Sequence, residues 1–315
     1  MRNQQSFADQ SGLALITAML VIAIVVTVAA YLSLGQQVWL RQAQNLLDMT
    51  QAGAVARGAF DLAAILLAED KKNSTTDNLT ETWARPIPVF PVEGGAVTAA
   101  ISDAQGRFNL NNLALANPGI HSRIFRGLLT SLKLNPDLTD ALIDWLDSDS
   151  DIRANGAEDN EYLALPTPYR AANQPLQSVD ELRLVRGFDA EVVQKLRPWV
   201  TVLPMAPAGT TINVNTASAL VLSALCGISL PDAEQLVTDR DKNPYASVPL
   251  PLCPQGSTSA GVITDYFEVT VQTQFGRLRR QTQALISRLG STPTVLGHRE
   301  LMSNSVLPTK VEEGK

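Results

Sequence analysis

The chain has 315 residues, of which 45% are hydrophobic and 18% are charged, and its net charge at pH 7 is −6. This apolar content is enough to bury about two domains, so disorder along the whole chain is excluded. The negative charge argues against a general nucleic-acid binder, which needs an excess of Lys and Arg to displace counterions. Two His and two Cys are too few for a His-rich metal site, a four-cysteine zinc site or an iron–sulfur cluster.

The first feature along the chain is an uncharged apolar run from Leu13 to Leu34. As a helix it would span about 33 Å, which is enough to cross a bilayer core. The run is too long for an ordinary secretory signal peptide. Helical apolar spacing without proline continues after it, so one helix is expected from Leu13 to about Asp70. Residues 13–34 would lie in a membrane and residues 35–70 outside it.

Residues 1–12 form a polar leader that resembles a type IV prepilin leader. In that family prepilin peptidase cuts after a glycine, so the resemblance implies processing between Gly12 and Leu13. Two positions differ from the usual pattern: Ser11 replaces a basic residue, and Thr17 replaces the Glu found at the fifth mature position. That Glu neutralises the N-terminal amine of a neighbouring subunit, so its absence suits the tip of a filament. An uncleaved membrane anchor is the alternative.

The rest of the chain alternates between strand and helix patterns. Residues 71–111 are predicted to form a linker followed by strands at Ala96–Ser102 and near Phe108. Residues 112–205 show helical apolar spacing and are predicted to form a helical domain. Residues 206–289 would complete the body, with a strand, a helix and a C-terminal β-hairpin around Phe275-Gly276-Arg277. Residues 290–315 lack periodicity and are expected to form a flexible tail.

This order predicts an α+β fold in which a small antiparallel sheet is interrupted by a large inserted helical domain. The helical domain contains the most informative segment, because eight acids and one base, Arg153, lie between residues 140 and 161. The acids are Asp140, Asp144, Asp147, Asp149, Asp151, Glu158, Asp159 and Glu161. So many carboxylates repel one another, and a bound hard cation removes that repulsion.

The acidic segment matches a twelve-residue calcium loop at most of its ligand positions. Asp147 would occupy position 1, Asp149 position 3, Asp151 position 5 and Glu158 position 12. Position 6 is Ile152 where the pattern requires Gly, so a standard EF-hand backbone is not expected. The sequence predicts structural calcium bound first by Asp147, Asp149 and Glu158, and next by Asp151 and Asp159. A solvated acidic loop that caps helices is the alternative.

Cys226 and Cys253 are the two cysteines of the chain. Outside the cytoplasm they are expected to form a disulfide, and two unrelated buried thiols are the alternative.

The segment Ile212–Ser218, with the residues that follow, resembles the helix-hairpin-helix modules of DNA-binding competence proteins. Acidic residues surround the second hairpin, and the second hairpin glycine is missing, so a packing role is favoured over DNA binding. No catalytic motif is present, and no enzyme activity is expected.

Together, the leader, the apolar helix and four further segments resemble the type II secretion minor pseudopilin K family. These segments are SDAQGRFNLNN (102–112), LIDWLDSDSDIRANGAEDNEY (142–162), LPTPYRAANQPLQSVDELRLVRG (165–187) and INVNTAS (212–218). The resemblance implies a pilin-like body with a large helical insertion, calcium in that insertion, and a complex with the I and J minor pseudopilins. Other pseudopilus subunits, prepilin peptidase and membrane lipid are the further partners implied, and no nucleic acid is expected.

The function implied by this resemblance is mechanical. The subunit would sit at the tip of a pseudopilus that assembles from the inner membrane and pushes folded exoproteins through the outer-membrane secretin. Residues 13–34 would then cross the inner membrane once, and residues 35–70 and the C-terminal domain would lie in the periplasm. Two alternatives remain from the sequence: a membrane-anchored DNA-uptake protein that uses the hairpin modules, and a minor pilin of a type IV pilus.

Overall fold

The computed structural model describes residues 7–253, 258–290 and 292–301. The helices are α1 (Phe7–Asn73), α2 (Gly119–Ser131), α3 (Leu138–Leu146), α4 (Asp159–Leu163), α5 (Ala190–Leu196), α6 (Ala219–Cys226) and α7 (Leu230–Lys242). The strands are β1 (Ile87–Val92), β2 (Gly95–Asp103), β3 (Phe108–Asn109), β4 (Val200–Thr201), β5 (Ile212–Asn213), β6 (Ala260–Gly261), β7 (Tyr266–Phe275), β8 (Leu278–Ser287) and β9 (Thr294–Leu301).

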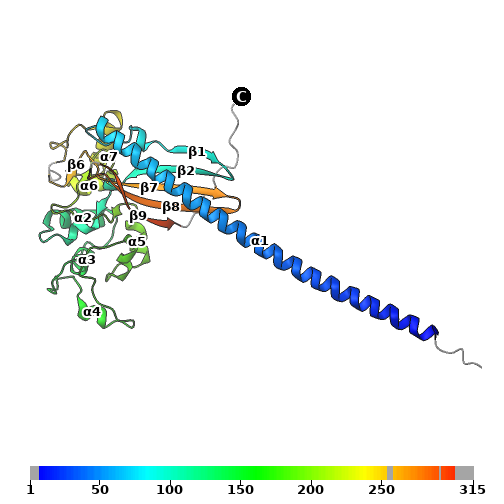
Figure 1. Cartoon of the computed structure of the whole chain (residues 1–315). Helices are drawn as coiled ribbons and strands as arrows, with labels where there is room; N and C mark the ends of the chain where they lie inside the picture. The colour runs from blue at the N-terminus through cyan, green and yellow to red at the C-terminus, as the bar shows by residue number, and fades with distance from the viewer. Residues whose placement is uncertain (1–6, 254–257, 291, 302–315) are drawn as a thin grey trace, which may run out of the picture.

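The predicted long N-terminal helix is confirmed by α1, which is continuous from Phe7 to Asn73. Its first part projects away from the rest of the molecule (Figure 1). The apolar side chains of that part are exposed, and it is the one helix among the described residues that alone is long and apolar enough to cross a membrane. Gly12 and Leu13, the predicted processing site, lie within α1. Residues 1–6 of the predicted leader lie outside the described residues.

The body is built on one antiparallel sheet with the strand order β1-β2-β7-β8-β9. Strands β2 and β7 pair along their whole length, although the helical unit lies between them in the sequence. This pairing confirms a helical insertion into a sheet. The predicted C-terminal hairpin is formed by β7 and β8, and Gly276 takes a positive φ of 52° in its two-residue turn.

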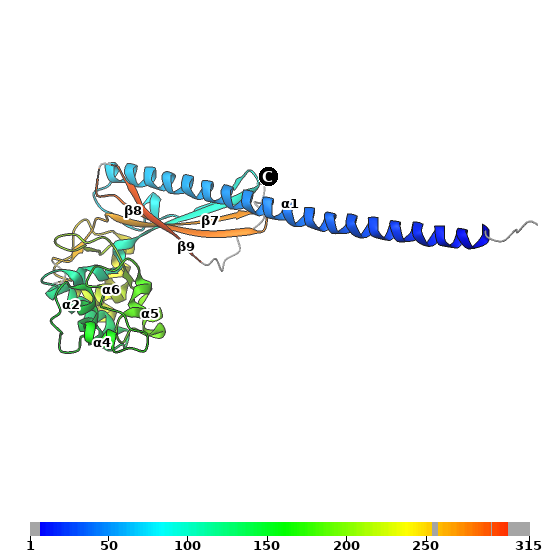
Figure 2. The ribbon, with the colours of Figure 1, turned by 60° about the horizontal axis from the view of Figure 1, so that its bottom comes forward.

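The second part of α1 covers one face of the sheet (Figure 2). Its buried side chains recur every three or four residues, which places them on one helix face. They are Ala52, Ala56, Phe60, Ala63 and Leu67. Alternate residues of β7 meet this face, because side chains of a strand point to opposite sides in turn. These are Phe267, Val269 and Val271, and Trp83 packs edge-on against Phe267 at 5.1 Å.

The helical unit has a separate and larger hydrophobic core, which extends from Phe108 to Ala260. Helices α6 and α7 pack together, and α6 also packs against α2. Helices α6 and α7 were expected in the body, since the predicted boundary of the helical domain is residue 205, but their buried side chains belong to this core. The helical unit lies at the end of the sheet opposite the free part of α1 (Figure 2).

Two strands of the five-stranded sheet were not expected from the sequence, and both lie at its edges. Strand β1 lies in the predicted linker and contains two prolines, which edge strands tolerate. Strand β9 pairs with β8 within the predicted flexible tail, so the prediction for residues 294–301 was wrong. Its side chains are exposed on both faces, which explains the absence of a period-two pattern. Residues 302–315 of that tail lie outside the described residues.

Candidate functional site

The acidic loop joins the end of α3 to the start of α4, on the side of the helical unit far from the sheet (Figure 1). Helix α3 is anchored because its apolar residues are buried, including Leu142 and Trp145. Trp145 also packs against Tyr162 of α4, with ring centroids 5.0 Å apart. The buried helix α3 and the buried Tyr162 of α4 therefore hold the two ends of the loop in place.

Three of the five predicted metal ligands come together in this loop. Asp147, Asp149 and Glu158 each offer a carboxylate oxygen, and these three oxygens lie within 4.8 Å of one another. Asp151 and Asp159 lie outside this group. The carboxylate of Asp159 accepts hydrogen bonds from Arg170 Nη1 at 2.9 Å and from the Ala171 amide at 3.0 Å. The first three predicted ligands are therefore the ones that the fold places side by side.

Several carboxylate oxygens in this group are buried without a hydrogen-bond partner among the described residues. They are Asp147 Oδ1 and both side-chain oxygens of Glu158, whose residue is only 5% exposed. An unpaired buried carboxylate is costly, because it has lost its water without gaining a donor or a cation. Calcium prefers oxygen ligands of this kind, so the donor set fits that ion.

Asp144 lies beside the predicted ligands, although the spacing of the acids in the sequence did not predict it as part of the site. It belongs to α3, one turn before Asp147, and its side chain is fully buried. Its Oδ2 accepts a hydrogen bond from the Arg153 amide at 3.1 Å, and its Oδ1 lies 3.2 Å from Arg153 Nε. The helical spacing of three residues, which places Asp144 beside Asp147, is the signal that could have found it.

The electrostatics of the loop follow from this crowding. Burial, together with the nearby charges of Asp144, Asp147 and Asp149, raises the pKa of Glu158 to about 7. Burial also raises the pKa of Asp144 to about 6 and the pKa of Asp147 above its usual range. Folding of the loop therefore disfavours the ionised form of these carboxylates, and a bound cation would stabilise that form.

The loop does not follow the EF-hand arrangement, as the residue at position 6 predicted. Ile152 stands there with its side chain exposed. Asn155, at position 9, donates its amide group to Asp140 Oδ2 at 3.2 Å. Gly156 is required at the next position, since a Cβ atom there would lie 1.7 Å from Asp144 Oδ2.

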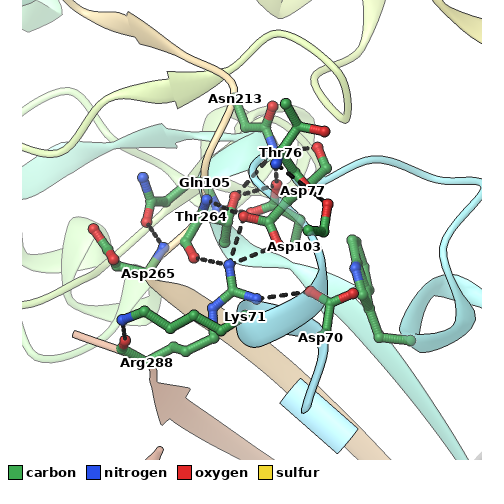
Figure 3. A network of polar contacts seen from close by, with 12 residues as sticks. Asp70, Lys71, Thr76, Asp77, Asp103, Gln105, Asn213, Thr264, Asp265 and Arg288 are labelled. Carbon is green, nitrogen blue, oxygen red and sulfur yellow. Dashed lines mark hydrogen bonds and ion pairs between the residues drawn. The ribbon is translucent and has the colours of Figure 1, made fainter. Parts of the chain in front are cut away.

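A second acidic group consists of Asp70, Asp77 and Glu81 and lies near the end of α1. Figure 3 shows Asp70 and Asp77 of this group. Here Arg288 supplies a counter-ion: its Nη1 lies 2.9 Å from Asp70 Oδ2, and its Nη2 lies 2.5 Å from Asp77 Oδ2. Glu81 accepts hydrogen bonds from three side chains, including Trp83 Nε1 at 2.6 Å. These contacts make the group part of a structural network.

The same network connects the body to the helical unit. Asn213 of β5 donates to the Asp77 carbonyl at 3.0 Å and to Asp103 Oδ2 at 2.9 Å. Asp103, at the end of β2, also accepts hydrogen bonds from Thr216 and Thr264 at 2.5 and 2.6 Å. All of these side chains except Thr216 are buried, so the two cores are joined by a polar junction (Figure 3).

The segment that resembles a DNA-binding hairpin has a packing role in this fold. Helices α6 and α7 meet at 116°, and Gly227 takes a positive φ of 66° between them. Arg240 of α7 is buried and donates to the carbonyls of Val214 and Ala217. Because its guanidinium already donates to these carbonyls, it is not free to bind a phosphate.

The predicted disulfide is present and joins Cys226, at the end of α6, to Cys253. Both residues are fully buried. His121 is buried beside Asn112, with its Nδ1 3.4 Å from Asn112 Nδ2. That position gives it a packing role in the helical unit.

Comparison with known proteins agrees with the fold and its insertion. Family models described as type II secretion system, protein K, match residues 106–205 and 212–249. The chain is 36% identical over 301 residues to the type II secretion system protein K of Pseudomonas aeruginosa, covering 89% of this chain and 88% of the relative. It is 34% identical to that of Klebsiella pneumoniae, covering 92% and 96%.

A solved structure is similar over the folded part of the chain. It is a chain of the crystal structure of the GspK-GspI-GspJ complex from the enterotoxigenic Escherichia coli type 2 secretion system. The two chains share 28% sequence identity with a TM-score of 0.72, and the match covers 83% of this chain and 100% of the other. The chain belongs to the type II secretion system protein K family.

Proposed function

We propose that this protein is a minor pseudopilin at the tip of the type II secretion pseudopilus, in complex with the I and J minor pseudopilins. Family membership and the similarity to a chain of the GspK-GspI-GspJ complex support this role. The observation that carries it is the position of the helical unit, at the end of the sheet away from the free part of α1 (Figure 2). A unit of this size would hinder the stacking of another subunit above it.

The proposed mechanism is mechanical, and no residue is assigned a catalytic role. The first part of α1 spans the inner membrane once, and the body and helical unit lie in the periplasm. Assembly of further subunits below the tip complex moves this subunit outward, so that it pushes folded exoproteins toward the outer-membrane secretin. The polar junction around Asp103 and Arg288 supports this action, because it connects the helical unit to α1 through buried contacts.

Processing by prepilin peptidase between Gly12 and Leu13 is part of this proposal. Cleavage would make Leu13 the first residue and place Thr17 at the fifth position. The Thr17 hydroxyl donates to the Ala14 carbonyl at 3.0 Å within α1 and offers no carboxylate to a neighbouring amine. A subunit of this kind is suited to the end of a filament.

The test of this assignment is the mature form of the full chain made in cells with and without prepilin peptidase. We expect an intact mass that corresponds to a start at Leu13 with a methylated amine, and copurification with the I and J minor pseudopilins from membranes. A chain that keeps Met1 in the presence of the peptidase would contradict the filament mechanism and leave a fixed membrane anchor.

Structural calcium in the acidic loop is the second part of the proposal. Asp147, Asp149 and Glu158 would hold the ion, with Asp151 and Asp159 within the same loop. The buried, unpaired oxygens of Asp147 and Glu158 support this assignment. We expect calcium to raise the melting temperature of the full chain in detergent. The Glu158→Gln variant should lose this rise, whereas the exposed Glu191→Gln control should keep it.

A further inference from the structure

Arg153 is the one basic residue of the acidic loop, and it lies between two of its carboxylates. Its Nε is 3.2 Å from Asp144 Oδ1, and its Nη2 is 3.2 Å from Asp147 Oδ2. Asp147 thus directs one oxygen to Arg153, and its other oxygen is buried without a partner. Among the described residues, Arg153 is the base that forms an ion pair with this ligand group, through Asp147.

Arg153 differs from Arg288, the counter-ion in the second acidic group. The Arg288 side chain is only 3% exposed and its guanidinium also donates to the Thr264 carbonyl at 2.7 Å, so it is a fixed part of the fold. The Arg153 side chain is 41% exposed. An exposed guanidinium can move into water at low cost, because water replaces its hydrogen bonds.

The backbone of Arg153, by contrast, is held in place. Its amide donates to Asp144 Oδ2 at 3.1 Å, and its carbonyl accepts from the Gly156 amide at 3.0 Å. The loop therefore keeps its shape if the side chain swings outward. Only the guanidinium needs to leave for the charge at Asp144 and Asp147 to become available.

A divalent cation at Asp147, Asp149 and Glu158 would create a conflict with this arrangement. It would place two positive charges beside the guanidinium on Asp147, and like charges at such short range repel one another strongly. Asp147 would also have to divide its charge between the ion and Arg153. The two cations therefore compete for one carboxylate.

We propose that Arg153 is a displaceable internal counter-ion of the acidic loop, which neutralises Asp144 and Asp147 without calcium and swings into solvent when calcium binds. This inference rests on the proposed calcium site and identifies the residue that sets its affinity. Arg153 stabilises the ion-free loop and lowers its affinity for calcium. The loop is thereby kept folded when calcium is scarce and responds to a higher calcium concentration than its carboxylates alone would require.

The experiment compares calcium binding by the full chain in detergent with that of three variants, using titration calorimetry. We expect Arg153→Gln to lower the dissociation constant for calcium about three- to tenfold, as expected when a competing ion pair is removed. Arg153→Lys should bind close to the wild type, because it keeps the charge. The control is Arg197→Gln, which removes the same charge from an exposed arginine paired with Asp180, a carboxylate that is not among the predicted ligands, and its dissociation constant should change less than about twofold.

A second measurement is the melting temperature of the same proteins in a chelator. Arg153→Gln should melt below the wild type without calcium and regain the difference when calcium is added. Unchanged or weaker calcium binding by Arg153→Gln would overturn the inference while leaving the calcium site in place. An equal change in Arg197→Gln would also overturn it, since net charge alone would then explain the effect. A wild type that binds no calcium would overturn both the site and the inference.

Discussion

At the scale of single residues, Glu158 links calcium binding to pH. Its pKa is raised from 4.5 to about 7 in the folded protein, chiefly by burial. Between these two values the folded form binds more protons than the unfolded chain, so the ion-free protein should lose stability as the pH rises through this window. Calcium binds the deprotonated carboxylate and therefore opposes that loss.

The expected result is a calcium-dependent rise in melting temperature that is larger at about pH 8 than at about pH 5.5, where Glu158 and Asp144 are largely protonated. Thermal melts of the full chain, with calcium or with a chelator at each pH, would measure it. In Glu158→Gln the melting temperature without calcium should depend less on pH. A calcium effect of equal size at both pH values would argue against Glu158 as a ligand.

Gly156 provides a second prediction at the residue scale. A Cβ atom at this position would lie 1.7 Å from Asp144 Oδ2, so Gly156→Ala must displace a buried carboxylate. We expect it to destabilise the protein by about 1–3 kcal/mol and to weaken calcium binding. Gly127→Ala in α2 is the matched control, because the added methyl group would be 3.6 Å from its nearest neighbour. Denaturant unfolding of both variants would show the difference, and equal effects would contradict it.

At the scale of elements, the disulfide ties the end of α6 to the segment that follows α7. Cys226 and Cys253 are separated by 27 residues. On the chain-entropy model, closing a loop of that length stabilises the fold by about 3–4 kcal/mol. The Cys226→Ala/Cys253→Ala double variant should lose roughly that amount, as measured by denaturant unfolding under oxidising conditions. Reduction of the wild type should produce a similar loss, and a loss below about 1 kcal/mol in both would show that the bond contributes little.

At the scale of the whole molecule, Arg288 determines how firmly the two cores are joined. Arg288→Met would leave Asp70 and Asp77 close together without their counter-ion. Removing one partner of a buried ion pair costs about 3–5 kcal/mol, so the variant should be destabilised by that order. Asp77→Asn in the same variant should restore part of the loss. Arg197→Met, which breaks an exposed pair with Asp180, should cost at most about 1 kcal/mol.

Limited proteolysis of the same variants would test the junction itself. If the network around Arg288 connects the body to the helical unit, Arg288→Met should be cut between the two units before either is degraded. Arg197→Met should be cut like the wild type. Uniform degradation of Arg288→Met would instead indicate a general loss of stability.

The sequence by itself determined the elements whose burial is regular. The uncharged run from Leu13 to Leu34 and the spacing after it defined α1, and period-two alternation defined the β7–β8 hairpin. Because the chain has two cysteines, an intramolecular disulfide could join only Cys226 to Cys253. The density of carboxylates identified the acidic loop. These features depend on local patterns, which a chain carries without reference to its fold.

Only the tertiary structure decided the features that depend on distant or one-sided contacts. Strand β9 is exposed on both faces, so it has no alternation to read, and α6 belongs to the helical core only because α2 packs against it. The spacing of acids suggested five metal ligands, but the path of the loop brought together Asp147, Asp149 and Glu158. The role of Arg153 depends on its distances to Asp144 and Asp147, which arise only when α3 and the loop are folded together.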